Sequence, residues 1–467
     1  MLVLLADLLP PRESKQHLGA LALAGIIAAL VIALVRWGTD VCGFRDMVRL
    51  DGYALFFDIV IAYAAALVVL LSMDYLRRRG AESGEYYALV LFAACGMMLL
   101  ASAGDLIIVF LGIELMSLSL YVLAGLFKSR RQSSEASMKY FLLGVFASAF
   151  LLYGIALLFG AAGSTNFERV AAAAARNPHD TLLLIGVALL LVGFGFKISS
   201  VPFHMWAPDV YEGAPTSVTA LIATGSKAAA FAALIRFLTT ALRPLQPDWT
   251  ALLWILAALS MTVGNVVAIA QTNLKRMLAY SSIAHVGYML VGLVAGGPQG
   301  TSAILFYLFA YVFTTAGTFG VLTLCERTGG TPEPDGDGAV DVREYAGLGR
   351  RSPALAFALT FFLLSLVGIP PLAGFFGKFY LFGAAVRAGY VWLAVIAVLN
   401  SAVAAYYYLR VVVYMYMREP EGAAATLAPS FAGGLALAIA FIGIVLLGVM
   451  PAPFVELAQV AVAPLLR

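Results

Sequence analysis

The chain has 467 residues, of which 62% are hydrophobic and only 12% are charged. Ordinary globular proteins have about 45–50% apolar and about 25% charged residues, so these charges are too few to cover a soluble surface of this size. The net charge of +3, from 29 basic and 26 acidic residues, is too balanced to indicate a nucleic-acid partner. The composition therefore predicts an all-α polytopic membrane protein in a lipid bilayer.

Motifs that bind cofactors are absent from the sequence. The cysteines Cys42, Cys95 and Cys325 lie far apart, without a CxxC or a Cys/His cluster. This argues against an iron–sulfur centre, a c-type haem or a structural zinc. No GxxxxGK[ST] or GxGxxG stretch is present either. We therefore expect no cofactor and no metal in this chain.

Thirteen segments are long and apolar enough to cross a membrane, which takes about 20 residues for about 30 Å of hydrocarbon. An apolar stub at residues 1–10 precedes them and is too short to span. The stretch 328–351 is rich in Gly, Pro and Asp and predicts a solvated loop. The predicted spans are 18–36, 52–76, 86–103, 104–127, 137–160, 181–207, 214–239, 250–270, 276–296, 302–325, 352–383, 389–417 and 431–450.

Basic residues are divided unevenly between the two sides that these spans define. Alternation places 17 on one side, Lys275 among them, and 9 on the other, including Arg45 and Arg236. Cytoplasmic loops carry an excess of Lys and Arg. We therefore expect the first side to be cytoplasmic, with the N-terminus inside and the C-terminus outside.

Three lysines and one glutamate lie well inside predicted spans. Lys197, Lys227 and Lys378 are flanked by apolar residues, and Glu114 is ten residues into a helix that starts near Asp105. At 1.5 Å per residue, Glu114 is about 15 Å deep, where a charge costs about 3 to more than 10 kcal/mol. Each must face a hydrated cavity or a partner. The alternative is a structural ion pair or a lysine that extends to the interface.

Lysine is suited to proton transfer at such a depth. Desolvation favours its neutral form, and a nearby carboxylate restores the charged form. A lysine whose counter-ion moves can therefore act as a proton switch, whereas arginine stays charged. None of the residues assigned to the interior of a span is arginine, which favours proton handling.

Helix breaks lie beside two of these lysines. Lys197 precedes Pro202 and Pro208, and Lys378 follows Pro370 and Pro371. Each break is an ordinary kink or a place for water at membrane depth. A pair of broken helices in the two halves of a chain is typical of an inverted-repeat transporter.

Histidine gives a weaker signal. His285 lies inside a span near Ser281 and Ser282 and is a candidate proton relay, and His204 is a weaker candidate beside the first break. A buried histidine can also be a purely structural hydrogen-bond donor. Asp209 and Glu212 are expected to shape a surface turn.

Five motifs resemble one family. They are LGIELMSLSLYVL around Glu114, KISSVPFHMWAPDVYEGAPT from Lys197, ATGSKAAAF around Lys227, QTNLKRMLAYSSIAHVGY around His285 and GIPPLAGFFGKFY before and after Lys378. They resemble the antiporter-like membrane subunits of respiratory complex I, the proton-pumping NADH:quinone oxidoreductase, over about residues 50–450. The motif PDVYEGAP and the lysine at position 378 are similar to those of the N-type chains of this family. The L and M types match less well.

The resemblance implies an architecture of fourteen helices with two inverted five-helix repeats. Thirteen are counted here, and the stub looks like the tail of a first helix, so we expect the native chain to start upstream of Met1. The implied organisation is N-terminal helices at 1–103, a first repeat at 104–239, a second at 250–417, and a C-terminal helix and tail at 418–467.

The resemblance also implies roles. Glu114 and Lys197 correspond to the pair of the first half-channel, Lys227 to the central lysine, His285 to the connecting relay and Lys378 to the second half-channel. NADH, flavin, iron–sulfur clusters and quinone are then expected on other subunits, with M-type and K-type chains as neighbours in a bacterial inner membrane.

Two rival functions stay open. A chain of a multisubunit cation/proton antiporter or of a membrane-bound hydrogenase would share the half-channels. A non-pumping membrane scaffold would not need the buried charges. The first rival is distinguished from a complex I chain by the subunits that co-purify with it. The scaffold is identified if the buried charges can be removed without loss of function.

Overall fold

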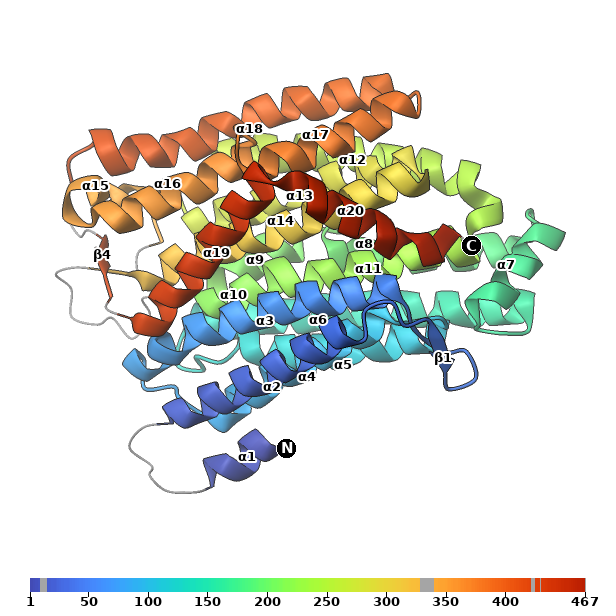
Figure 1. Ribbon diagram of the computed structural model, residues 1–467, viewed down its shortest axis with the longest axis horizontal. Coiled ribbons are helices and arrows are strands. Elements are labelled where there is room, and N and C mark those ends of the chain that lie inside the picture. Colours follow the sequence, from blue (N-terminus) through green and yellow to red (C-terminus); the bar gives the residue numbers. More distant parts are fainter. Residues whose placement is uncertain (9–14, 328–339, 421–424, 429, 467) are drawn as a thin grey trace.

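The computed structural model describes residues 1–8, 15–327, 340–420, 425–428 and 430–466. In this part of the chain most helices run along one common direction (Figure 1). The long helices are α2 (Gln16–Val35), α3 (Gly52–Arg78), α4 (Gly84–Ala101), α5 (Leu106–Ala124), α6 (Arg131–Ala162), α8 (Thr181–Ile198), α12 (Gln246–Ile269), α13 (Leu274–Ala295), α14 (Gly297–Leu324), α18 (Val391–Met417) and α19 (Phe431–Val449).

One further crossing is assembled from four consecutive pieces: α10 (Thr216–Leu221), the π-helical turn η1 (Ile222–Ser226), α11 (Lys227–Arg236) and the π-helical turn η2 (Phe237–Ala241). Twelve helices of the described residues, this one included, are long and apolar enough to cross a membrane. The thirteenth predicted span, 352–383, is broken into α16 (Pro353–Val367) and α17 (Ala373–Arg387). Twelve of the thirteen predicted spans are therefore confirmed, and the thirteenth corresponds to two shorter helices of 15 residues each.

Shorter elements connect the spans. The strands β1 (Val41–Gly43) and β2 (Val48–Leu50) form one antiparallel hairpin, and β3 (Cys325–Arg327) pairs antiparallel with β4 (Ala425–Leu427). The remaining helices are α1 (Leu2–Asp7), α7 (Phe167–Arg176), α9 (Trp206–Gly213), η3 (Arg243–Leu245), η4 (Val342–Tyr345), α15 (Leu348–Arg351), α20 (Pro451–Val462) and η5 (Ala463–Leu466).

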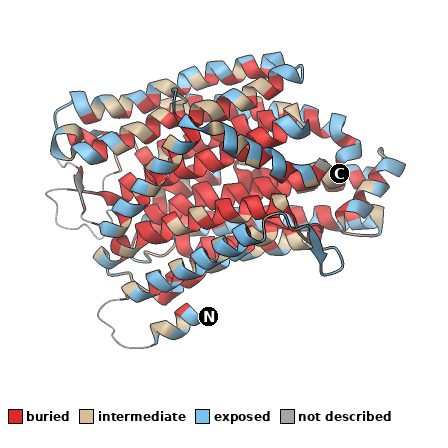
Figure 2. Cartoon of the chain, in the orientation of Figure 1, coloured by how far each residue is buried: buried red, intermediate tan, exposed pale blue. Residues whose placement is uncertain are grey.

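The interior of the bundle is formed by helices that other helices surround. Figure 2 shows the buried residues concentrated at the centre, with exposed residues on the outer helices. The most apolar 18 residues of α14 and of the segment Thr216–Ala241 are completely buried. By contrast, α2, α6 and α19 are largely exposed on apolar faces. Such helices present apolar side chains to lipid or to neighbouring proteins, because lipid tails are as apolar as the core.

Several helices begin at side chains that satisfy their free backbone amides. Asp51 accepts a hydrogen bond of 2.8 Å from the Ala54 amide at the start of α3. Asp105 does the same at α5 with the Ile107 amide at 2.8 Å, and Asn273 at α13 with the Arg276 amide at 3.1 Å. Short polar side chains are preferred at this position because the first amides of a helix lack internal partners.

Both predicted helix breaks are present. The first begins after Ile198, where Ser199 adopts a left-handed φ of 64°, and helix resumes at Trp206. Pro208 is inside the first turn of α9, so it does not contribute to the break. The second lies between Val367 and Ala373, and Gly368 there has a φ of 91°, which suits glycine.

Two expectations about segments outside the long spans need correction. Within the predicted solvated loop 328–351, residues 328–339 lie outside the described residues, but 340–351 fold into η4 and α15. Tyr345 and Leu348 are fully buried there. The C-terminal segment was expected to hold one helix, yet α20 follows α19 and packs on α3 and α14, with Phe454 6.3 Å from Phe309. Prolines at its start suit a first helical turn.

Candidate functional site

Lys227 begins α11, within the membrane-crossing segment Thr216–Ala241. The π-helical turn η1 ends immediately before it, and such turns recur at functional sites because they displace side chains from the regular helical pattern. Its side chain is 1% exposed, and its Nζ donates a hydrogen bond to Ser282 Oγ on α13. Ser282 also pairs with the hydroxyl groups of Tyr211 at 3.2 Å and Tyr311 at 2.9 Å. None of the described carboxylates lies within ion-pairing distance of Lys227.

Lys197 is in the last turn of α8, directly before the first break. Its Nζ donates to Ser117 Oγ at 2.6 Å and to the Tyr121 hydroxyl at 3.4 Å, both on α5. The Tyr140 ring is 5.9 Å from the same nitrogen. Lys197 is therefore buried among hydroxyl groups and aromatic faces.

Three aromatic rings in contact, which we call the aromatic wall, lie between Lys197 and Lys227. The Tyr140 ring stacks on Trp206 at 4.5 Å, and Trp206 is 6.5 Å from Tyr211. The Tyr211 ring in turn lies 5.9 Å from the Lys227 Nζ. Because a ring face attracts a cation, this wall stabilises a positive charge at either lysine.

Glu114 is half-buried on α5 and accepts a hydrogen bond from Ser148 on α6. Glu114 and Lys197 are not in direct ion-pairing contact in the structure. Ser117, one helical turn from Glu114 on the same helix, receives the Lys197 hydrogen bond instead. The expected coupling of Glu114 with Lys197 would therefore act through space or through Ser117.

His285 connects three helices. Its Nδ1 pairs with the Tyr307 hydroxyl on α14, and its Nε2 pairs with the Tyr408 hydroxyl on α18 at 3.2 Å. The imidazole is 3% exposed and lies 5.3 Å from the Tyr311 ring, whose hydroxyl pairs with Ser282. His285 is therefore adjacent to the hydroxyl cluster that holds Lys227.

Lys378 lies beside the second break. Its Nζ donates to the carbonyl groups of Leu366 at 2.9 Å and Val367 at 2.8 Å, and to Ser401 Oγ at 2.7 Å. Those carbonyls are the ones that the interrupted helix α16 leaves without intrahelical partners. Lys378 and Ser401 also line an apolar groove of about 730 Å³ along α17 and α18.

His204 is not joined to these residues. It lies in the first break, half-buried, and its Nδ1 has no hydrogen-bond partner among the described residues. The structure thus brings Lys197, Lys227, His285 and Lys378 into one buried region, with Glu114 at its edge, and leaves His204 apart from it.

The orientation count placed Arg130, Arg236 and Lys275 on a surface, but the structure buries all three. Arg236 was assigned to the outer surface, but it is 2% exposed and forms a bidentate ion pair with Asp51. The distances are 2.7 Å from Nη1 to Oδ2 and 2.8 Å from Nη2 to Oδ1. Lys275 was assigned to the cytoplasmic surface, but it is fully buried and donates to the Ala214 carbonyl at 2.6 Å. All three are close to a span end, where sequence alone does not distinguish an interface from the interior.

Asp209 and Glu212 were expected in a surface turn, but they lie in the helix α9 and form ion pairs there. Asp209 binds Lys139 at 2.7 Å and Arg276 at 2.6 Å, and Arg276 also binds Glu212 at 2.9 Å. Partial burial opposes ionisation of Asp209, but the hydrogen bonds and charges of Lys139 and Arg276 outweigh it and lower its pKa. This cluster ties α6, α9 and α13 together.

Sequence reasoning missed most of the connecting hydroxyl groups. The sequence points only to Ser281 and Ser282, as neighbours of His285. Tyrosines and serines are common in apolar helices and carry no periodic signal of their own. Those now found between the charged residues are Ser117, Tyr121, Tyr140, Tyr211, Tyr288, Tyr307, Tyr311, Ser401, Tyr407 and Tyr408.

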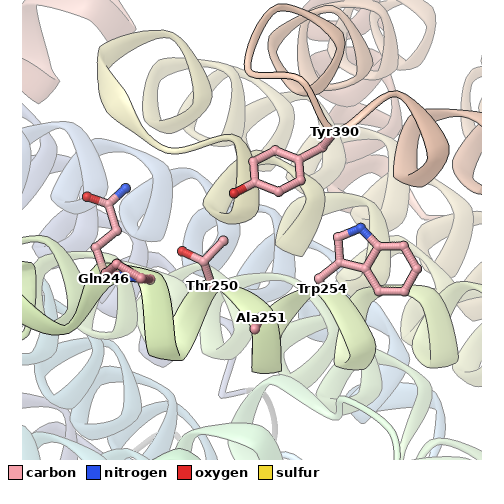
Figure 3. A pocket seen from close by; sticks show the side chains of 6 residues that line it. Gln246, Thr250, Ala251, Trp254 and Tyr390 are labelled. Atoms are coloured by element: carbon pink, nitrogen blue, oxygen red, sulfur yellow. The ribbon is translucent and has the colours of Figure 1, made fainter.

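A second cavity, of about 620 Å³, lies away from the buried lysines. Gln246, Thr250, Ala251 and Trp254 of α12 face Tyr390 across it (Figure 3). It contains no charged side chain. Within the described residues, no group of three or more His, Cys, Asp or Glu is placed to hold a metal ion.

Two broken membrane helices, joined by buried lysines, a histidine and hydroxyl groups, define an antiporter-like membrane subunit. A family model described as NADH:quinone oxidoreductase/Mrp antiporter, transmembrane, matches residues 103–404. Over 464 residues the chain is 50% identical to NADH-quinone oxidoreductase subunit N of Trichlorobacter lovleyi, covering 99% of this chain and 94% of that one. The chain therefore belongs to the subunit N family of the NADH-quinone oxidoreductases.

Other relatives agree. Subunit N 2 of Roseiflexus castenholzii is 46% identical over 468 residues, covering 98% of this chain and 92% of that one. A chain of respiratory complex I from Thermus thermophilus, solved with bound aureothin, superposes with a TM-score of 0.80 at 39% identity and 94% coverage of both chains. A chain of the Mrp complex from Dietzia has the same fold, with a TM-score of 0.85 at 21% identity, covering 97% and 93%.

Proposed function

We propose that this chain moves protons across a bacterial cell membrane along a relay of Glu114, Lys197, Lys227, His285 and Lys378. The observation that supports it is that Lys197, Lys227, His285 and Lys378 are all buried and each is hydrogen-bonded to hydroxyl groups, with aromatic rings between Lys197 and Lys227. Burying three lysines is costly, and a purely structural role would be met by apolar residues at lower cost.

The acceptors of the lysines are suited to repeated protonation. Lys227 and Lys378 are held by hydroxyl and carbonyl oxygens, which bind an ammonium without fixing its charge as a carboxylate would. Adding a proton to one lysine then raises the energy of a charge on the next, since their repulsion is poorly screened in a low dielectric. Protonation changes can in this way pass along the relay from one end to the other. His204, outside these contacts, has at most a minor part.

The redox chemistry would take place in other subunits. In this proposal NADH, flavin, iron–sulfur clusters and quinone bind elsewhere in the complex, and M-type and K-type chains adjoin this one. Residues 104–239 and 250–417 form the two inverted repeats, each with one broken helix. The side rich in basic residues faces the cytoplasm, and the C-terminus lies outside.

The orientation has a built-in probe. Cys42 is exposed in the β1–β2 hairpin, on the side assigned to the exterior. Cys95 lies within the span α4 and Cys325 is buried. A membrane-impermeant maleimide should label Cys42 in intact spheroplasts. Labelling only after the cells are broken would reverse the orientation.

The relay is tested by replacing its lysines one at a time with methionine. In vesicles that contain the assembled complex, each variant should translocate fewer protons per NADH oxidised, with the other subunits still present. The matched control is Lys128→Met, because Lys128 is exposed. A non-pumping scaffold predicts no change in any variant. An antiporter or hydrogenase chain predicts that NADH dehydrogenase subunits do not co-purify.

A further inference from the structure

Two carboxamides, Asn265 and Asn400, lie among the tyrosines between His285 and Lys378. Asn265 on α12 is fully buried and lies between two tyrosines. The Tyr407 hydroxyl donates to its Oδ1 at 2.9 Å, and its Nδ2 donates to the Tyr288 hydroxyl at 3.1 Å.

The two tyrosines lead to opposite ends of this region. Tyr407 packs against Tyr408 with ring centroids 4.4 Å apart, and the Tyr408 hydroxyl pairs with His285 Nε2 at 3.2 Å. The Tyr288 ring lies 4.8 Å from the Lys378 Nζ. Along these contacts the order of groups is His285, Tyr408, Tyr407, Asn265, Tyr288 and Lys378. His285 also packs edge-on against the Tyr288 ring, with centroids 5.5 Å apart, but both imidazole nitrogens pair with other tyrosines, Tyr307 and Tyr408.

The orientation of the Asn265 amide is fixed by backbone geometry. Its Nδ2 also lies 2.9 Å from the Met261 carbonyl, which can only accept, so the group facing that carbonyl must be the NH₂. Asn400 supports the same orientation. Its Nδ2 donates to the Ile396 carbonyl at 3.0 Å, which directs its Oδ1 to the Asn265 Nδ2 at 3.4 Å.

A carboxamide in this position donates and accepts hydrogen bonds but does not transfer a proton. A hydroxyl group both donates and accepts, so it can take up one proton and release another. For a proton to cross Asn265, Oδ1 would take the proton of Tyr407 and Nδ2 would release one to Tyr288. The side chain would then be left as its unstable imidic acid tautomer.

We propose that Asn265 is the insulating residue of the relay, which keeps protons at His285 from passing to Lys378 except when the amide leaves this position. The proposal rests on the proposed function of the relay. It assigns to Asn265 a control over when the outer half-channel is supplied with protons. His285 and Lys378 still sense each other's charge across it, because the electric field needs no proton transfer.

Asn265→Asp tests the proposal directly. The new carboxyl replaces Nδ2 with an oxygen that faces the Met261 carbonyl, which favours the protonated acid, and this acid can take a proton at one oxygen and release it from the other. We expect vesicles containing the assembled complex to lose an imposed pH gradient severalfold faster than wild type, without NADH. NADH oxidation should also respond less to an added uncoupler.

Two matched variants separate insulation from general damage. Asn265→Leu removes the hydrogen bonds without adding a titratable group, so its vesicles should stay as tight as wild type. Asn400→Asp places a carboxyl at the neighbouring position outside the line of groups, and should also stay tight. Asn265→Ser, where a hydroxyl and a water can fill the vacated space, should leak in the same sense if the Asp variant fails to assemble.

Tight vesicles with Asn265→Asp, or with Asn265→Ser where the Asp variant does not assemble, would overturn the proposal. An equal leak in Asn400→Asp would overturn it as well. Failure of the relay itself has a different signature, since Lys227→Met and Lys378→Met would then pump like wild type. Impaired pumping in those two variants with tight Asn265→Asp vesicles would leave the relay in place and remove only the insulating role.

Discussion

Lys197 donates a hydrogen bond of 2.6 Å to Ser117, which lies one helical turn from Glu114 on α5. The lysine and the glutamate of the proposed first half-channel thus both lie beside Ser117 on α5 without touching each other. A proton gained or lost at Glu114 would be felt at Lys197 through the field and through a hydroxyl that can reorient.

This arrangement predicts coupling in a double-mutant cycle. Glu114→Gln should favour loss of the proton from Lys197 because a nearby negative charge is removed, and Lys197→Met should remove the positive charge itself. Each single variant should impair NADH-driven pumping more than it impairs assembly. The double variant should be less than additive, measured as pumping at matched complex content. Strict additivity with normal assembly would show the two residues to be independent.

The ion pair of Asp51 with Arg236 should act on stability. Both side chains are 2% exposed, and breaking a buried pair by removing one partner typically costs about 3–5 kcal/mol. Arg236→Met should therefore lower the thermal stability of the solubilised complex. Asp51→Asn combined with Arg236→Met should recover part of the loss, because no uncompensated charge remains.

Arg169→Met is the control for this pair, since Arg169 is exposed on α7. It should leave the melting temperature unchanged. If Arg236→Met melts like wild type, the pair contributes nothing to the fold.

Lys378 should tolerate a carboxyl better than an apolar side chain. Lys378→Met leaves the Leu366 and Val367 carbonyls without their donor and removes the titratable group, so proton transfer through this chain should weaken. Lys378→Glu can donate to one of these carbonyls when protonated and can still titrate beside the break, so it should retain more pumping than Met. Proton uptake per NADH at matched complex content measures the order, and equal pumping in Met and wild type would remove Lys378 from the relay.

Residue type and depth made the burial of Lys197, Lys227 and Lys378 predictable from the sequence. A lysine inside an apolar span is conspicuous, and prolines beside Lys197 and Lys378 locate the breaks because proline lacks a backbone donor. The spans follow from length and hydropathy alone. These are local properties, readable without knowing which helices touch.

Pairings between distant segments were not predictable in this way. Asp51 and Arg236 are 185 residues apart, and each looks like an interfacial charge at the end of its own span. Asn265 and Tyr407 are 142 residues apart in the sequence. A single asparagine in an apolar helix is part of no sequence pattern that identifies its partner. Helix α20 is too short to be distinguished from a tail by hydropathy.

In the proposed relay, the buried Lys227 must gain and lose a proton for this chain to pump. The measurement is proton translocation per NADH oxidised in vesicles with the assembled complex carrying Lys227→Arg, beside Lys227→Ala and the exposed-site control Lys128→Arg. Arginine keeps the charge but cannot release it at physiological pH, so both Lys227 variants should pump less than the control, with the complex intact. Wild-type pumping and turnover in Lys227→Arg would contradict a protonation switch at this residue.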